Sequence, residues 1–80
     1  MNELYIYSND KYSPVLRVPY EGSKWWNALE EALYIHFELT PCGRTWRQAL
    51  TRYEDVTFSY GNAEFFTLHR VSDNTFSIKF

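Results

Sequence analysis

The feature that most constrains the fold is a change in the spacing of apolar side chains along the chain. Near both ends, apolar and polar residues alternate, which is the period of a half-buried β-strand. In the middle, apolar residues recur every three or four positions, which is the period of an amphipathic helix. We therefore expect strands at residues 4–7, 15–20, 56–60, 65–71 and 76–80, with turns at residues 8–11, 61–64 and 72–75.

The first helix is predicted at about residues 24–39, with the hydroxyl of Ser23 as its N-cap. One face of this helix is apolar, and the opposite face is acidic. His36 lies near the centre of the apolar face, so we interpret it as a histidine satisfied within the core. The apolar face holds Trp25, Leu29, Ala32, Leu33, His36 and Leu39, and the opposite face holds Asn27, Glu30, Glu31, Tyr34 and Glu38.

A second, shorter helix is expected after a turn at residues 40–43. Thr45 and Gln48 have the spacing of a capping box at its start. The apolar face of this helix holds Trp46, Ala49, Leu50 and Tyr53, and the other face holds Arg44, Arg47, Gln48, Thr51 and Arg52, with no acidic residue. Three roles are open for these arginines. They could bind phosphates or the carboxylates of a partner protein, or they could pair with acidic residues of the first helix, namely Glu30, Glu31 and Glu38.

These elements follow the order β-β-α-α-β-β-β, which predicts an α+β fold. We expect a small antiparallel sheet with the two helices packed on one face. The last three strands should form a meander, and Pro19 indicates that its strand lies at an edge or ends there. Eighty residues leave no room for a second hydrophobic core, so residues 1–80 are expected to form one compact domain.

Aromatic residues make up 20% of the chain, so several rings must lie partly in solvent in a domain this small. Tyr5 and Tyr7 alternate with Leu4 and Ile6 and should therefore face the other side of the sheet. Phe65 and His69 are expected to lie opposite Phe66 and Leu68 in the same way. An aromatic and polar sheet face suits a protein interface, and it could also stack the bases of RNA.

Signals for catalysis or metal binding are weak. One Cys and two His lie far apart, and no CxxC or phosphate-binding glycine pattern is present, so we expect no metal site and no cofactor. A Cys–His pair between Cys42 and His36 or His69 would be needed for nucleophilic catalysis. We expect no enzymatic activity, and a small enzyme using Cys42 or His69 stays the second alternative.

Charge and composition narrow the classes of partner. The formal net charge of −2 argues against a surface built throughout for nucleic acid or anionic lipid. No apolar run approaches the length of about 18–20 residues that spans a bilayer, so no membrane partner is expected. The single Cys42 cannot form an internal disulfide and the chain opens without a signal-peptide pattern, which predicts a cytoplasmic location.

We therefore predict a small protein-binding module, an inhibitor or adaptor that masks a surface of a larger protein. Compact acidic domains without catalytic motifs are common among phage-encoded inhibitors of host machinery, including anti-CRISPR proteins. Their frequency there makes a phage-encoded inhibitor the favoured kind of binding module. The alternative is a nucleic-acid-binding module that uses the Arg-bearing helix. A homodimer formed by an edge strand that pairs with a second copy is also open. The residues expected to contact the partner are Arg44, Arg47, Arg52, Tyr5 and Tyr7.

Overall fold

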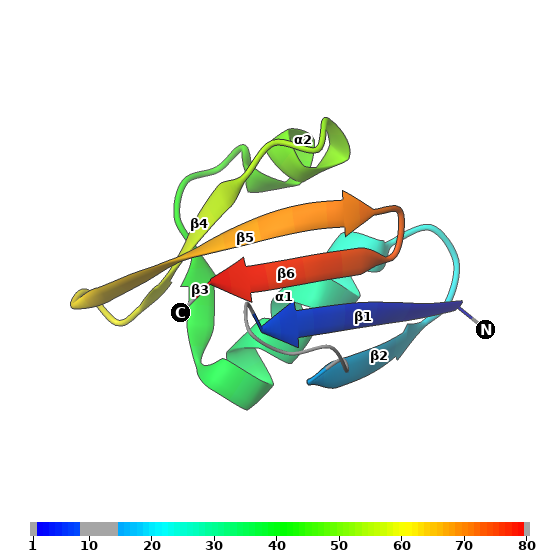
Figure 1. Ribbon diagram of the computed structural model, residues 1–80, viewed down its shortest axis with the longest axis horizontal. Helices are drawn as coiled ribbons and strands as arrows, with labels where there is room; N and C mark the ends of the chain where they lie inside the picture. The colour runs from blue at the N-terminus through cyan, green and yellow to red at the C-terminus, as the bar shows by residue number, and fades with distance from the viewer. Residues whose placement is uncertain (1, 9–14, 80) are drawn as a thin grey trace.

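A computed structural model describes residues 2–8 and 15–79, and over these residues it contains one six-stranded sheet and two helices (Figure 1). The strands are β1 (Asn2–Ser8), β2 (Leu16–Tyr20), β3 (Leu39–Pro41), β4 (Val56–Tyr60), β5 (Glu64–Ser72) and β6 (Thr75–Lys79), and the helices are α1 (Trp25–Phe37) and α2 (Trp46–Thr51). The α+β class is confirmed. The expected turn at residues 8–11 falls largely outside the described residues, and so does Phe80.

The sheet is mixed, so the prediction of an antiparallel sheet is wrong in one respect. Its strand order is β2-β1-β6-β5-β4-β3, and every neighbouring pair is antiparallel except β1 and β6. These two strands run parallel, with Tyr5 beside Thr75 and Ser8 beside Ile78. The N-terminal hairpin and the expected β4-β5-β6 meander are both present, and β6 joins them at the centre of the sheet (Figure 1). Local spacing does not show which distant strands pair.

The predicted element order lacks strand β3, because α1 ends earlier than the apolar spacing indicated. The helix ends at Phe37 because Glu38 takes up a left-handed conformation, with φ of 57°. The N–H of Glu38 donates to the carbonyl of Tyr34 at 2.8 Å, which closes the last turn. Leu39 is therefore buried as a strand residue opposite Tyr60, not as the last apolar residue of α1.

Both helices begin without the side-chain caps that the sequence predicted. Lys24 occupies the N-cap position of α1 in place of Ser23, and its side chain makes no capping hydrogen bond. Thr45 is the N-cap of α2, as expected, but its side chain makes no capping bond either. Its ψ of 16° is far from the extended conformation in which an N-cap hydroxyl reaches the first helical N–H groups, so the capping box does not form.

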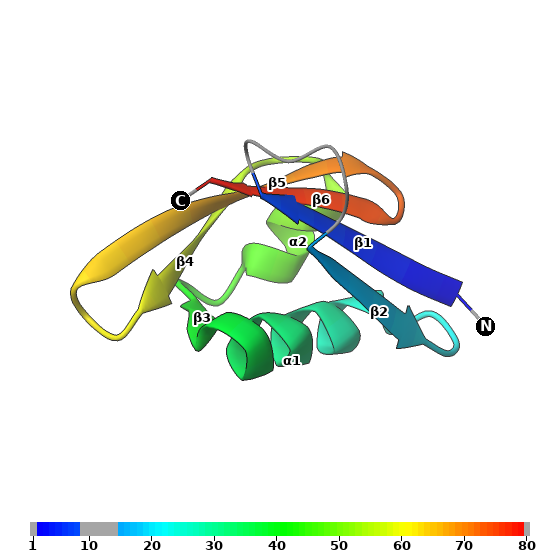
Figure 2. The same cartoon turned by 60° about the horizontal axis from the view of Figure 1, so that its bottom comes forward.

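The core lies between one face of the sheet and the two helices, which pack on that same face, as predicted (Figure 2). It is a single cluster to which β1, β3, β4, β5, β6 and both helices contribute buried side chains. The largest fully buried residues are Phe58, Phe76, Leu4, Ile6, Leu29, Leu33, Leu39, Leu50, Leu68 and Ile78. The alternation of β1 therefore buries Leu4 and Ile6 and turns Tyr5 and Tyr7 to the face without helices.

His36 is exposed, so its interpretation as a core histidine is wrong. The buried stripe of α1 is narrower than the helical wheel indicated and comprises Leu29, Ala32 and Leu33. His36 and Ile35 instead border a hollow with Val18 and Pro19 of the edge strand β2. His36 thus faces the edge of the sheet at β2, whereas Phe37 in the same turn of the helix packs against the core.

Candidate functional site

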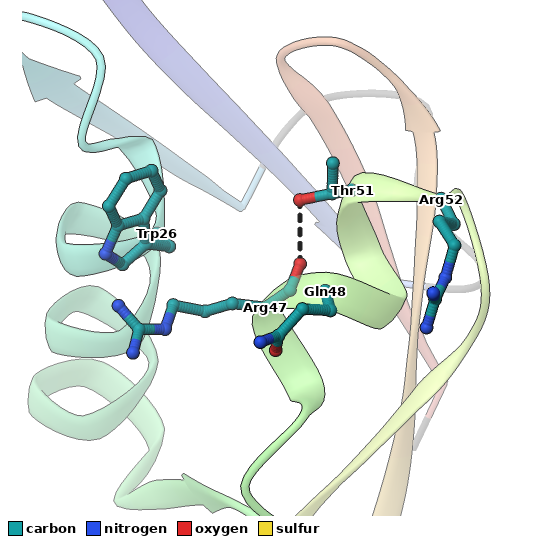
Figure 3. Close-up of a pocket in the computed structure, with 5 residues that line it drawn as sticks. All are labelled: Trp26, Arg47, Gln48, Thr51 and Arg52. Carbon is teal, nitrogen blue, oxygen red and sulfur yellow. Dashed lines mark hydrogen bonds between the residues drawn. The ribbon is translucent and has the colours of Figure 1, made fainter.

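The candidate site is a hollow of about 400 Å³ between the two helices (Figure 3). Trp26 contributes from the first turn of α1, while Arg47, Gln48 and Thr51 come from α2. Arg52, the C-cap residue of α2, completes the lining. Arg47 and Arg52 thus belong to a formed concavity, whereas Arg44 precedes α2, is exposed and lies outside this lining.

Two adjacent tryptophans anchor the α1 side of the hollow. Trp25 stacks on the core residue Phe76, with ring centroids 5.8 Å apart and an interplanar angle of 27°. Trp26 meets Trp25 edge to face at 5.9 Å and 82° and is half-buried. The ring of Trp26 is consequently held in place by the core and still reaches the surface. Trp26 is a site residue that helical periodicity does not predict, although its place beside Trp25 on the apolar face of the helix was a usable signal.

Arg47 crosses from α2 toward α1 and places its guanidinium 5.7 Å from the centre of the Trp26 ring (Figure 3). This is a cation–π arrangement, and it leaves the guanidinium N–H groups without a carboxylate partner among the described residues. The hydroxyl of Thr51 donates to the carbonyl of Arg47 at 2.8 Å, one turn earlier in the same helix. Arg47 is therefore oriented by a ring and is not neutralised.

The arginines do not pair with the acidic residues of α1. Within residues 2–8 and 15–79, no carboxylate of Glu30, Glu31 or Glu38 lies within 4.0 Å of any of them. In the part of the chain that the structure describes, the one ion pair of these arginines is between Arg52 and Glu54, at 3.6 Å, with both side chains more than half exposed. Exposed pairs of this kind contribute little stability and are easily exchanged for another partner.

Tyr5 and Tyr7 lie on the other side of the molecule. Both are half-buried on the sheet face that carries no helix, whereas the arginines belong to the helical layer. The structure therefore divides the five expected contact residues into two surfaces, and a single flat partner surface cannot cover both. The sheet face also exposes Phe65, whose side chain is 64% accessible.

The residues of the enzymatic alternative are separated as well. His69 Nδ1 lies 2.6 Å from Asp55 Oδ1, and both side chains are about half exposed on the open sheet face. Ser77 is directly opposite His69 in the neighbouring strand, yet no hydrogen bond joins them among the described residues. Cys42 is exposed, and across the described ranges its thiol makes no hydrogen bond to either histidine.

Arg70 was not among the predicted site residues. It is buried, with 8% of its surface accessible, and it attaches α2 to the sheet. Its guanidinium lies 4.4 Å from the ring centre of Trp25 and 4.7 Å from that of Tyr53. It donates to the carbonyls of Leu50 at 3.1 Å, Ser72 at 3.2 Å and Asp73 at 2.8 Å. The alternation of β5, which buries position 68, would have placed position 70 on the same inner face.

Tyr53 completes this attachment just after α2. The helical spacing predicted Tyr53 on the apolar face of the second helix. Tyr53 instead lies after the end of α2, is exposed and has a left-handed backbone, with φ of 61°. Its hydroxyl donates to a carboxylate oxygen of Asp73 at 2.5 Å. This hydrogen bond, together with burial and the negative charge of Asp73, raises the pKa of Tyr53, while the nearby Arg70 opposes the shift.

Among residues 2–8 and 15–79, no group of three or more His, Cys, Asp or Glu side chains is placed to hold a metal ion. Neither described helix has the length and apolar character needed to cross a membrane. Comparisons with protein-family models, with curated proteins and with solved structures find no match to the chain.

Proposed function

We propose that this chain is a protein-binding module, an inhibitor or adaptor that uses the hollow between α1 and α2 to dock on an acidic surface of a larger protein. The observation that carries the proposal is the state of Arg47. It is exposed, oriented by Trp26 and free of any carboxylate partner among the described residues. A positioned but unneutralised arginine beside a half-buried tryptophan is the composition of a binding hot spot.

The charges favour a protein partner over a nucleic acid. The chain as a whole has ten acidic and eight basic residues, and the hollow contributes two arginines and no lysine. Few phosphates could be neutralised by such a surface, so nucleic-acid affinity would be low and strongly dependent on salt. A protein carboxylate offers the paired oxygens that an arginine fork binds through two parallel hydrogen bonds.

The composition of the hollow also favours binding over catalysis. Trp26, the two arginines and Gln48 offer no general acid or base that titrates near neutral pH. The hydroxyl of Thr51 has no base beside it among the described residues, and it donates to the helix backbone. Cys42 and His69, the residues of the enzymatic alternative, do not line the hollow.

The test is a pull-down with the tagged chain from a nuclease-treated lysate of the source or host cell, comparing wild type with Arg47→Glu. We expect the wild type to retain one protein near stoichiometry through moderate salt and Arg47→Glu to lose it. The matched control is Arg17→Glu, which makes the same charge change on the edge strand β2. The Arg17→Glu variant should therefore still retain the captured protein.

Three other outcomes would count against the proposal. If both variants lose the captured protein equally, net charge and not the hollow governs the interaction. If the retained material is nucleic acid, with an affinity that falls steeply with salt and less steeply for Arg47→Ala, the nucleic-acid alternative holds. If Arg47→Glu retains the partner while a change at Tyr5 or Tyr7 releases it, docking occurs on the open sheet face.

A further inference from the structure

We infer that the hollow recognises an extended acidic segment of the partner, in which two acidic residues are separated by at least one residue and an aromatic or aliphatic side chain lies next to this pair. This inference rests on the proposed function and specifies the chemistry of the partner. It is argued from the order of the groups across the hollow: Trp26 on α1, then Arg47, Gln48 and Arg52 along α2 (Figure 3).

Trp26 supplies the apolar end of this order. The ring is held edge to face by Trp25, which is stacked on Phe76, so the aromatic surface is already ordered before a partner arrives. A preformed apolar surface reduces the entropy lost on binding. An acidic segment without an apolar side chain would leave this surface unused, and the partner segment should therefore carry one.

The two arginines set the spacing of the carboxylates. Arg47 and Arg52 are five positions apart, which is about 7.5 Å along the axis of an α-helix and about 140° around it, and Figure 3 shows their side chains on different sides of α2. Alternate side chains of an extended peptide point the same way and are about 6.6 Å apart. The two acidic residues must therefore be separated by at least one residue, and an extended backbone spans this separation in fewer residues than a helical one.

Gln48 lies between the two arginines and supplies hydrogen-bonding groups for the segment's backbone. Its amide makes no hydrogen bond within residues 2–8 and 15–79, so both its donor and its acceptor are free to contact a peptide. Thr51 contributes less because its hydroxyl already donates to the carbonyl of Arg47. A volume of about 400 Å³ lies at the small end of the usual range for ligand sites, which suits a few side chains of one segment.

Glu54 occupies part of the same electrostatic site. Its carboxylate lies 3.6 Å from the Arg52 guanidinium and is exposed, so it competes with an incoming carboxylate for that arginine. Removing the charge by Glu54→Gln should consequently strengthen binding of an acidic segment. A purely structural role for Glu54 would give the opposite sign or no change.

The inference is tested by selecting a random peptide display library on the folded wild-type chain, with counter-selection on Arg47→Glu. We expect enrichment of peptides with two acidic residues separated by at least one residue and an aromatic or aliphatic residue within two positions on the N- or C-terminal side of this pair. The most enriched peptide is then titrated by NMR, following the three indole N–H signals, which are assigned with a Trp26→Phe variant. The Trp26 signal should shift most.

The variants should weaken this peptide in a defined order. We expect a loss of about tenfold for Arg47→Ala and a smaller loss for Arg52→Ala, because Glu54 already partly neutralises Arg52 in the free protein. Glu54→Gln should tighten binding by about two- to threefold. Arg44→Ala is the matched control, since Arg44 lies outside the hollow, and it should change affinity by less than about twofold.

Each other result overturns the inference. This ligand chemistry would be excluded by enrichment of basic or uncharged peptides, by enrichment of acidic peptides without an apolar residue, or by no enrichment at all. A peptide that shifts the NMR signals of Trp25 and Trp46 but not that of Trp26 would exclude it as well. If these failures occur while the pull-down still depends on Arg47, the proposed function stands and the partner presents a folded surface. If the pull-down also fails to depend on Arg47, the proposed function fails with it.

Discussion

Arg70 is a buried cation that no carboxylate of the described residues neutralises. Its charge is distributed instead over three backbone carbonyls and the faces of three aromatic rings, those of Trp25, Tyr53 and Phe76. Burial of an unpaired charge is costly, and a planar guanidinium can offset that cost because it donates in several directions while it stacks. The carbonyl of Leu50 belongs to α2 and those of Ser72 and Asp73 to the β5–β6 turn region, so one side chain positions the helix that carries Arg47.

Tyr53 makes this attachment sensitive to alkaline pH. Its hydrogen bond to Asp73 raises the pKa of Tyr53 in the folded state above the ordinary value of about 10, so the bond stabilises the fold below that pH. The stabilisation is lost as pH rises through the higher folded pKa, because the phenolate repels the Asp73 carboxylate. We expect the difference in unfolding free energy between wild type and Tyr53→Phe to shrink above pH about 10, measured by urea unfolding.

The control for this pH effect is Tyr34→Phe. Tyr34 is exposed on α1, and its hydroxyl makes no hydrogen bond among the described residues. This substitution should leave the unfolding free energy nearly unchanged at neutral pH. A Tyr53→Phe variant whose difference from wild type stays constant from pH 7 to 11 would show that the Asp73 contact does not contribute in solution.

At the scale of elements, the two edges of the sheet share one feature. The edge strands are β2 and β3, and each contains a proline, Pro19 and Pro41. The next N–H after Pro41, that of Cys42, donates to the carbonyl of Thr57 at 2.9 Å. Because ladder partners alternate along an antiparallel strand, the missing N–H of Pro41 faces the free edge. Each edge strand thus has one position without a donor, and at Pro41 this position faces the free edge, which disfavours a homodimer formed by pairing of β3.

We expect Pro19→Val to promote self-association. The change restores an N–H and adds a β-branched side chain to an exposed edge, which together favour pairing with a second copy. Light scattering after size exclusion over a range of concentrations measures the effect. Arg17→Val is the control because it adds the same side chain on β2 without adding a donor. Equal association of the two variants would attribute the effect to apolar surface and not to the missing donor.

At the scale of the whole molecule, β6 joins the N-terminal hairpin to the rest of the sheet. It lies between β1 of the N-terminal hairpin and β5 of the meander, and it contributes Phe76 and Ile78 to the single core. Both helices pack against a face that exists only when this strand is in place. The domain is therefore expected to unfold as one unit, since no subset of the described elements encloses a core of its own.

Removing residues 75–80 should leave the chain without a stable fold. A chain of this length has a stability of about 4–12 kcal/mol, while loss of a buried Phe costs about 3–5 kcal/mol and loss of a buried Ile about 2–5 kcal/mol. Near-UV circular dichroism and NMR signal dispersion should both be lost. The full-length Lys79→Ala variant, which changes an exposed residue of the same strand, should keep them. A cooperative unfolding transition in the truncated chain would contradict this view.

The sequence by itself determined the type of most elements and the sides on which their residues lie. The periods of two and 3.6 depend only on local backbone geometry, so they separated Leu4 and Ile6 from Tyr5 and Tyr7 and grouped Arg47 with Arg52. They also predicted the hairpin, the meander and both helices to within a few residues. Local spacing was less informative where chain direction changes, as at Glu38, where a left-handed residue ends α1 and allows β3 to form.

Only the tertiary structure decided how these elements combine. The parallel pairing of β1 with β6, the exposure of His36 beyond the sheet edge and the burial of Arg70 all depend on residues distant in sequence. The same is true of the candidate site, because Trp26 and Arg47 are brought together by the packing of two helices on one sheet face. Periodicity shows which side chains share a face of one element, whereas a binding site requires that faces of different elements meet, and that is determined by the packing of the whole core.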